Sequence, residues 1–420
     1  MNRWAASIVQ AARVGTRPVR RVGRRWLNHI NGLRKAVSVP VANLLLGGER
    51  FIEAGIYARM IGDSLRPSRR VADGPHAALL RAYDRIGDRI LQSPEFEQTD
   101  YYRNAAQCID MTGAYCFDSQ APRDIARIAR GFIDDYKGVA EWRKRPRRPL
   151  SLPPDPLLVR PIKDSACYEV IDGHHRVAIA AVKGQKTIRV VPIWQPAHTP
   201  LQELLLGVFW NKGRRELYQP IDSPELGDKW ILVRRCADRL EIMRRFLAES
   251  AITPGAARSY LDLGASYGWF VSQMAAAGYD SLGVERDPFS CGVGELMYGL
   301  APDRMVRADC VRFLGENTRR FDIVSCFSVL HHFVNGKGPI AAEEFIRMID
   351  GVTGSVLFLD TGQEHETWFK PDLKGWSPDF IESWLKHHTT FSRIVRLGVD
   401  QDARAPFQDN YGRTLFACVR

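Results

Sequence analysis

Short apolar runs alternate with helical periodicity over the C-terminal half of the chain. The runs at 259–264, 281–285 and 321–329 are typical of buried strands, and a further short strand precedes Arg307. A helical segment follows each of the first two strands. Strands that alternate with helices predict an α/β fold built on a doubly wound, Rossmann-like sheet.

Proline and charge patterns divide the N-terminal half. Residues 49–149 show helical spacing interrupted by prolines, and Pro75 begins one predicted helix. The stretch 143–156 is basic and then proline-rich, so it cannot continue a helix. We expect five segments: an arm over 1–48, a helical region over 49–149, a small α+β unit over 150–198, a connecting helix and linker over 199–228, and the α/β domain over 229–420.

The arm holds most of the positive charge. Residues 1–48 contain nine Lys or Arg and no acid, which leaves only +2 of the net charge of +11 for the rest of the chain. Apolar residues recur at helical spacing from Trp26 to Val37. This pattern is compatible with a disordered extension, a transit peptide or an amphipathic helix on an anionic membrane surface. Because the rest of the chain is nearly neutral, we expect no DNA partner.

Composition narrows the class of protein. The 420 residues are 45% hydrophobic and 25% charged, as in globular proteins of two or three domains. The eight cysteines form no C-x-x-C pair and no zinc-finger spacing with histidine. We therefore expect reduced thiols, no metal site and a cytoplasmic location. If the arm forms the amphipathic helix, it would also make a peripheral contact at the inner membrane. The longest apolar run, 36–48, contains Pro40 and is shorter than the roughly 20 residues of a membrane-spanning helix.

A glycine turn, D-L-G-A-S-Y-G, follows the first strand of the C-terminal domain. Ligands of an open α/β sheet bind at the carboxyl ends of the strands, where Gly264 and Gly268 would let the backbone approach them. Glu285 ends the second strand, where a carboxylate can accept both hydroxyls of a ribose. Asp262, inside the first strand, suits a ligand with an amino group and a sulfonium. Asp309 follows the third strand and is placed to accept from an adenine amine.

With these motifs the segment 229–420, slightly under half of the chain, resembles class I S-adenosylmethionine-dependent methyltransferases. The resemblance implies S-adenosylmethionine as the cofactor and a seven-stranded sheet. Further strands would lie at 355–361, 392–397 and 413–419, the last antiparallel between its neighbours. The resemblance also implies the following cofactor-binding residues: Asp262, Gly264, Ala265, Ser266, Gly268, Glu285, Asp309, Cys310 and Phe327.

His331 and His332 follow the fourth strand, on the acceptor side of the expected cofactor site. A hydroxyl acceptor needs its proton removed, and a histidine of near-neutral pKa suits that role. Either histidine is a candidate catalytic base; alternatively, the pair shapes the loop. The polar segment 364–366 borders the same mouth and either contacts acceptor hydroxyls or is solvated.

The fourth strand lacks the motifs of enzymes that methylate DNA bases. Neither D/N-P-P-Y/F nor a Pro-Cys nucleophile occurs, since Cys326 is flanked by Ser325 and Phe327. We therefore expect a small-molecule or glycan acceptor that is methylated on oxygen. The acceptor itself is not predicted, because a fold resemblance gives a reaction type and not a substrate.

A second motif, D-G-H-H-R, lies between a strand at 168–171 and a helix at 174–183, with another strand at 186–193. This unit is similar to the ParB/sulfiredoxin-like domain over 150–198. The resemblance implies that phosphates of ATP or CTP, with Mg, contact the helix N-terminus and the motif. The implied residues are Asp172, Gly173, His174, His175 and Arg176. Three roles for this unit remain open: it turns over a nucleotide, it binds a ligand without turnover, or its motif has only a packing role.

The sequence thus supports three functional hypotheses. The first is a cytosolic bacterial methyltransferase that uses S-adenosylmethionine. The second is a kinase or nucleotide-hydrolysing protein in which the ParB-like unit is the working site and the methyltransferase domain is its partner. The third is a surface-bound binding module directed by the arm.

Overall fold

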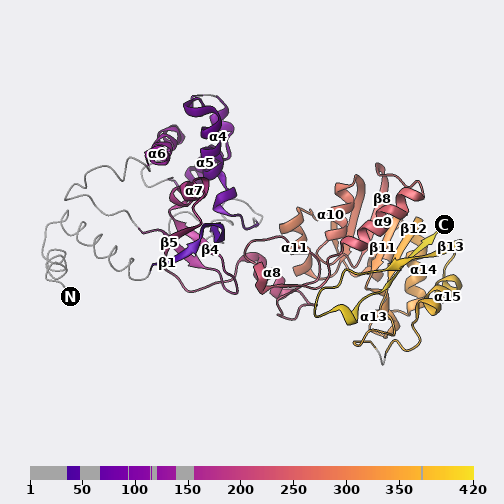
Figure 1. Cartoon of the computed structure of the whole chain (residues 1–420). Coiled ribbons are helices and arrows are strands. Elements are labelled where there is room, and N and C mark those ends of the chain that lie inside the picture. The colour runs from indigo at the N-terminus through magenta and orange to yellow at the C-terminus, as the bar shows by residue number, and fades with distance from the viewer. Residues whose placement is uncertain are drawn as a thin grey trace, which may run out of the picture. The chain divides into compact units, whose positions relative to one another are not determined.

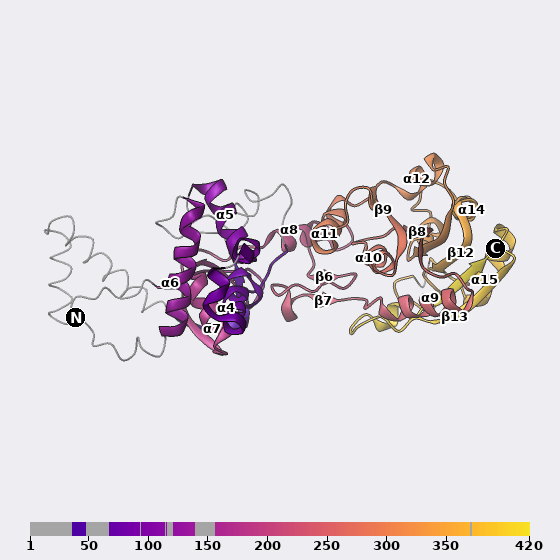
Figure 2. The same ribbon diagram turned by 90° about the horizontal axis from the view of Figure 1, so that it is seen from above.

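The computed structural model describes residues 36–47, 67–92, 94–113, 115, 121–138, 156–369 and 372–420. The chain divides into two compact units (Figures 1 and 2). Unit 1 comprises residues 1–200 and 223–227, and unit 2 comprises 201–222 and 228–420. Residues 1–35 lie outside the described part, so membrane contact by the arm stays a prediction. None of the described helices combines the length and apolar character needed to span a membrane.

Unit 1 has the α+β character that the sequence predicts for its centre. Its mixed sheet has the order β1-β5-β3-β4-β2, and in Figure 1 the helices lie to one side of it. The strands are β1 (Val37–Pro40), β2 (Leu44–Leu46), β3 (Leu158–Pro161), β4 (Tyr168–Asp172) and β5 (Thr187–Pro192). The described helices are α4 (Pro75–Ile86), α5 (Asp100–Thr112), α6 (Ile125–Gly138) and α7 (His174–Val182).

Residues 37–46 differ from the prediction, which placed them in the arm. β1 pairs antiparallel with β5, and β2 pairs parallel with β4. From residue 37 onward the helical spacing of apolar residues ends. Val37 and Val39 occupy every second position, as in a strand, and Pro40 cannot continue a helix. Leu44 and Leu45 are fully buried, so this segment belongs to the core of unit 1.

Unit 2 is built on a seven-stranded sheet of order β10-β9-β8-β11-β12-β14-β13. Its strands are β8 (Gly255–Leu263), β9 (Tyr279–Glu285), β10 (Met305–Arg307), β11 (Phe321–Phe327), β12 (Thr353–Asp360), β13 (Arg393–Val399) and β14 (Thr414–Val419). β14 lies between β12 and β13 and runs antiparallel to both, as the resemblance implied. The pairs among β8, β9, β10, β11 and β12 are parallel.

Helices cover both faces of this sheet. They are α9 (Ala237–Glu249), α10 (Trp269–Ala276), α11 (Pro288–Tyr298), α12 (Cys310–Glu316), α13 (Leu330–Val334), α14 (Ala342–Val352) and α15 (Pro378–His388). A further helix, α8 (Pro200–Gly207), precedes them in the chain. Side chains alternate between two buried clusters, since Tyr260 packs with α9 and α10 whereas Leu261 and Leu263 pack with α14 and α15. The predicted doubly wound α/β fold is thereby confirmed.

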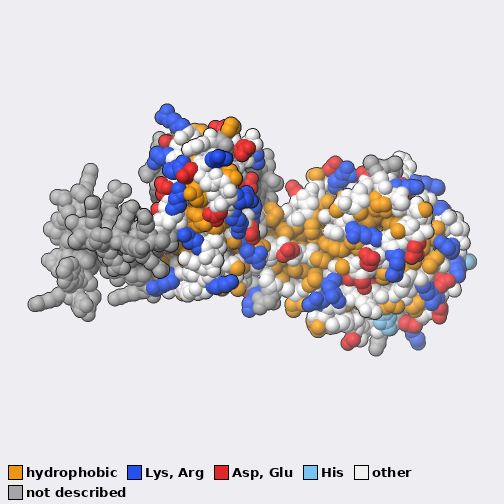
Figure 3. Space-filling view, turned by 45° about the horizontal axis from the view of Figure 1, so that its top comes forward, with side chains coloured by type: hydrophobic (Ala, Val, Ile, Leu, Met, Phe, Trp, Pro, Cys, Tyr) orange, Lys and Arg blue, Asp and Glu red, His pale blue; other side chains and the backbone are white. Residues whose placement is uncertain are grey.

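Most of the predicted connecting segment 199–228 belongs to unit 2. Residues 201–222 cluster with the α/β domain. Within them β6 (Glu216–Leu217) pairs in parallel with β7 (Ile231–Leu232). On the face drawn in Figure 3, acidic and basic side chains are interspersed over both units.

Candidate functional site

The turn after β8 lies where the strand order of the sheet reverses. β8 has β9 on one side and β11 on the other, which in doubly wound sheets leaves a crevice at the carboxyl ends of the strands. Gly264 and Ser266 both have left-handed backbones, at φ +73° and +53°. A Cβ on Gly264 would stand 2.4 Å from Val329 Cγ2, so a side chain there would displace the wall of the crevice.

Glu285 connects this turn to the loop that follows β9 by hydrogen bonds. Its Oε2 accepts from the backbone N–H of Ser266 at 2.9 Å, and its Oε1 accepts from that of Asp287 at 2.8 Å. Burial raises the pKa of Glu285, and the two amides act against that rise. Each carboxylate oxygen has two lone pairs, so Glu285 can still accept a ligand hydroxyl.

Two further acids cap helices beside the crevice. Asp287 Oδ1 accepts from Phe289 N at 3.0 Å at the start of α11, and its Oδ2 accepts from Phe209 N at 2.9 Å. Asp309 Oδ1 accepts from Val311 N at 2.9 Å at the start of α12. These bonds fix both carboxylates at the strand ends.

A cavity of about 520 Å³ opens at this edge of the sheet. Eight of the predicted residues line it: Gly264, Ser266, Glu285, Asp309, Cys310, Phe327, His331 and His332. The structure therefore brings the expected cofactor and acceptor residues to one place. Such a cavity is within the size range of small-molecule sites.

Three predicted cofactor residues do not line the cavity. Asp262 is buried and accepts from Ser325 Oγ at 2.6 Å, and burial raises the pKa of Asp262 to about 7. Ala265 is buried behind the turn. A Cβ on Gly268 would stand 2.4 Å from Leu300 Cδ1, so the absence of a side chain at this position permits close packing. Contact of these three residues with a cofactor stays a prediction.

The two histidines differ in environment. His331 is 3% exposed, and its Nδ1 accepts from Gly362 N at 3.3 Å, which places its proton on Nε2. Burial, followed by the charge of Arg413, lowers the pKa of His331 well below its ordinary value. His332 is exposed at the cavity wall, and partial desolvation followed by the charges of Lys337 and Arg286 lowers its pKa too. His332 is therefore the better placed candidate base.

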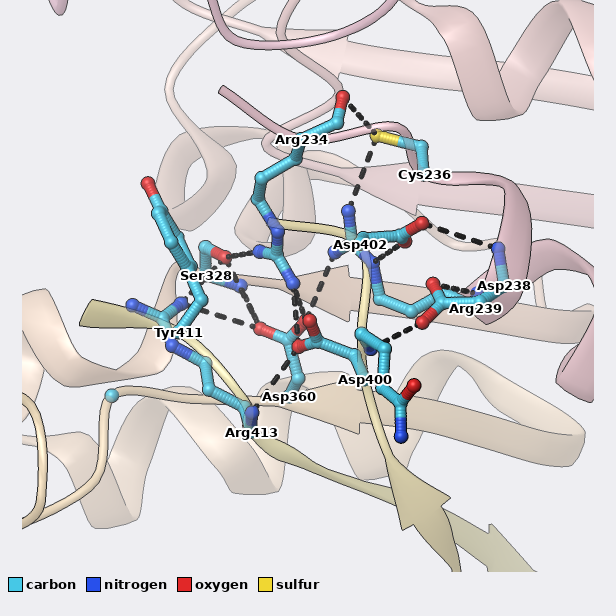
Figure 4. Close-up of polar contacts among 12 residues, drawn as sticks. Arg234, Cys236, Asp238, Arg239, Ser328, Asp360, Asp400, Asp402, Tyr411 and Arg413 are labelled. Atoms are coloured by element: carbon cyan, nitrogen blue, oxygen red, sulfur yellow. Dashed lines mark hydrogen bonds and ion pairs between the residues drawn. The ribbon is translucent and has the colours of Figure 1, made fainter. Parts of the chain in front are cut away.

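A buried network of arginines and carboxylates lies beside the cavity (Figure 4). Asp360, at the end of β12, is wholly buried, and its Oδ2 accepts from Arg239 Nη1 at 3.0 Å and from Arg234 Nη2 at 3.5 Å. Arg413 Nη1 stands 3.6 Å from Asp360 Oδ1. Burial would raise the pKa of Asp360, but the charges of these three arginines outweigh it and hold the pKa well below its ordinary value.

The network reaches the cavity through Ser328 and Arg413, which both line it. Ser328 has φ +59°, and its N and Oγ donate to Asp360 Oδ1 at 2.8 and 3.1 Å. Its Oγ also accepts from Arg413 Nη1 at 2.7 Å. The strained backbone at the end of β11 is thus held by charged groups. This network is not predicted from the sequence, because neither the loop residues Arg234 and Arg413 nor Arg239 on α9 carries a pattern that distinguishes buried from exposed arginines.

The polar segment 364–366 does not reach the cavity lining. Glu366 is fully buried and accepts two bonds of 2.8 Å from Arg413. His365 Nε2 lies 2.8 Å from Tyr411 O, and Glu364 accepts from Gly375 N at 3.1 Å. Of the two alternatives, direct contact with an acceptor is not favoured; the segment supports the wall.

In unit 1 the D-G-H-H-R motif spans the end of β4 and the start of α7. Gly173, at φ +106°, precedes α7, and Arg176 Nη2 lies 3.7 Å from Asp172 Oδ2. The ring of His175 instead stacks on Phe132 with 4.1 Å between centroids. This ring packs against the helical part of the unit.

Both motif histidines belong to a cluster of aromatic rings. His175 Nε2 lies 3.0 Å from Tyr101 Oη, and His174 stacks on His76 at 5.6 Å. Burial lowers the pKa of His174 to about 4 and that of His175 to about 3. Neutral, packed rings are poor phosphate ligands, so any phosphate contact would fall to Gly173 and Arg176. Among the described residues no group of three His, Cys, Asp or Glu could hold a metal ion.

Comparison with solved structures gives matches at low sequence identity, of which three are described below. No family model matches the chain, and no curated protein matches it. One similar structure is WbdD, a bifunctional kinase-methyltransferase, at 19% identity and TM-score 0.41, covering 52% of this chain and 46% of that one. A second is magnesium protoporphyrin IX methyltransferase from Synechocystis PCC 6803 with bound SAM, at 16% identity and TM-score 0.31, covering 44% of this chain and 79% of that one. A third is a SAM-dependent methyltransferase from Archaeoglobus fulgidus, at 15% identity and TM-score 0.30, covering 42% of this chain and 91% of that one. The chain thus spans under half the length of WbdD, and its function is inferred from the geometry of its own site.

Proposed function

We propose that unit 2 is an S-adenosylmethionine-dependent methyltransferase that methylates an oxygen of a small molecule or a glycan. The proposal rests on the cavity at the strand ends, which is lined by Gly264, Glu285, Asp309 and the histidine pair. The sheet order, with β14 antiparallel between β12 and β13, supports the same reading. An activated methyl group on a sulfonium is the chemistry that the cofactor would supply.

The lining residues fit this cofactor by their chemistry. Gly264 leaves room that a Cβ would fill, and no basic side chain occupies the turn itself. Glu285 would accept from ribose hydroxyls and Asp309 from the adenine amine. Phe327 and Val329 supply an apolar wall. Together these residues would hold and orient the ligand, and orientation is a large part of the catalysis of a displacement reaction.

The cavity lining is rich in aromatic side chains. Phe209 and Trp368 are 56% and 47% exposed although both line the cavity, and Trp210 and Phe369 line it as well. Exposed aromatic faces suit the apolar face of a sugar or another organic ring. This supports an organic acceptor of modest size, with His332 placed to remove its hydroxyl proton.

Methyl transfer by this site should depend on neutral His332. The pKa of His332 lies below its ordinary value of 6.5, so the base stays unprotonated at pH 7 and the rate should fall only as the pH drops below that lowered pKa. His332→Ala should reduce the rate about 100-fold. The measurement is release of S-adenosylhomocysteine, with the acceptor identified in candidate pools by a mass gain of one methylene.

The control for this prediction is His387→Ala, which alters a histidine at the end of α15, outside the cavity lining. It should keep the full rate and the same pH profile. An unchanged rate and profile in His332→Ala would remove the base assignment.

A second candidate function is nucleotide or phosphate binding by unit 1. It is favoured by Gly173, whose left-handed backbone starts α7, and by Arg176 beside Asp172 at that helix end. We expect any turnover of ATP or CTP with Mg to be lost in Arg176→Ala. A protein inert toward both nucleotides, measured by phosphate release, would remove this candidate.

A further inference from the structure

Two cations on the cavity wall have no acidic partner in the described part of the chain. Arg286 follows β9, Lys337 follows α13, and both side chains are exposed and line the cavity. No ion pair joins either of them to a described carboxylate, whereas other surface arginines such as Arg304 and Arg396 are paired. Unpaired cations inside a cavity are groups that a ligand can still neutralise.

The acids of the cavity lining are held by backbone N–H groups. Glu285 and Asp287 each accept two such bonds, and Asp309 caps α12. Arg413, the third cation of the lining, is held bidentately by Glu366. Arg286 and Lys337 are therefore the two lining cations that no described carboxylate pairs with.

Arg286 and Lys337 line the same cavity as His332 and come from different loops. The backbone N of Lys337 donates to His332 O at 2.8 Å, which fixes the loop that carries the lysine. Arg286 comes from the loop between β9 and α11. The charges of both residues contribute to the lowered pKa of His332. The two cations thus share the cavity wall with the candidate base and lie outside the glycine turn.

We propose that the methyl acceptor carries an oxyanion, a phosphate monoester or a carboxylate, beside the oxygen that is methylated, and that Arg286 and Lys337 bind it. This inference rests on the proposed function, since it names the substrate class of the same site. The oxyanion would neutralise both cations, and the aromatic wall would receive the organic part. Arg286 offers a planar fork of donors and Lys337 a point charge, a combination that suits tetrahedral and planar oxyanions.

The test measures the ring resonance of His332 by NMR in the full chain with isotope-labelled histidine rings. The resonance is assigned to His332 by its absence from the spectrum of His332→Gln. Inorganic phosphate stands for phosphate monoesters and acetate for carboxylates, each against chloride at equal ionic strength to remove screening. With S-adenosylhomocysteine present, at least one oxyanion should shift the His332 resonance saturably and raise its pKa. Arg286→Ala and Lys337→Ala should each weaken that binding about tenfold.

Arg347→Ala, which removes an exposed arginine of α14 outside the cavity lining, should leave oxyanion binding unchanged. A His332 resonance that responds equally to phosphate, acetate and chloride would overturn the proposal. So would a loss of S-adenosylhomocysteine affinity in Lys337→Ala or Arg286→Ala, because the cations would then serve the cofactor. Failure of S-adenosylhomocysteine to bind the unaltered protein would instead contradict the proposed function, so the two failures are distinguishable.

Discussion

Replacing Asp360 with alanine is expected to lower the free energy of unfolding of unit 2 by about 3–5 kcal/mol. Asp360 is wholly buried and contacts Arg234 and Arg239, with Arg413 at 3.6 Å. Its removal deletes the carboxylate that the three arginines share, and it leaves each of them with one remaining acidic partner, Asp400, Asp402 or Glu366, in a region that excludes water. The backbone N of Ser328, at a strained φ of +59°, would lose its acceptor as well.

The matched control is Asp280→Ala. Asp280 also contacts two arginines, Arg304 and Arg319, but its side chain is 34% exposed. Surface pairs of this kind contribute about 0–1 kcal/mol. Urea denaturation of both variants measures the contrast, and equal losses would show that the buried network is not a major source of stability.

The same network sets a pH dependence for stability. The folded-state pKa of Asp360 lies below the ordinary value of 3.8, so its stabilising contribution is fully present above that value. The contribution is lost as the pH falls from the ordinary pKa toward the lowered one. Stability near neutral pH should therefore not depend on this group, and acid denaturation of Asp360→Ala should begin at higher pH than in the unaltered chain.

Gly264→Arg is expected to abolish binding of S-adenosylmethionine and S-adenosylhomocysteine. The position has φ +73°, lines the cavity, and leaves 2.4 Å between an added Cβ and Val329 Cγ2. A long cationic side chain would also fill the space beside Glu285. Gly264→Ala, which adds only the Cβ, should still weaken binding at least tenfold, because the wall must shift.

Gly299→Arg is the control for backbone strain. Gly299 has a similar left-handed φ of +64°, but an added Cβ would meet nothing within 4 Å. Both variants place a side chain on a left-handed backbone, which costs about 1 kcal/mol of conformational energy. Only the Gly264 variants should lose cofactor affinity. Equal affinity of all variants, with circular dichroism showing folded protein, would place the cofactor elsewhere.

Much of unit 2 could be predicted from the sequence because its strands are buried on both faces. The runs predicted at 281–285 and 413–419 lie within one or two residues of β9 and β14, and α4 begins at Pro75 as predicted. Buried parallel strands are continuous apolar runs, and proline at the first helical turn is a strong local signal. The residues at strand ends, including Glu285 and Asp309, also reached the expected cavity for this reason.

Other features depend on long-range contacts that no local pattern reports. β1 and β2 pair with strands more than a hundred residues away, so residues 37–46 appeared to continue the arm. The close approach of Leu300 to Gly268, where an added Cβ would lie 2.4 Å from Leu300 Cδ1, is likewise not visible in the local sequence. The buried Arg234, Arg239 and Arg413 come from separate loops and helices and meet only in the folded unit.

We expect the cavity at the ends of β8, β9, β10 and β11 to bind the adenosyl cofactor. Isothermal titration of the full chain with S-adenosylhomocysteine measures this binding. One site per chain is expected, with a dissociation constant of about micromolar order that is lost in Gly264→Arg and kept in Gly299→Arg. A folded protein that releases no heat with either S-adenosylhomocysteine or S-adenosylmethionine would contradict this expectation.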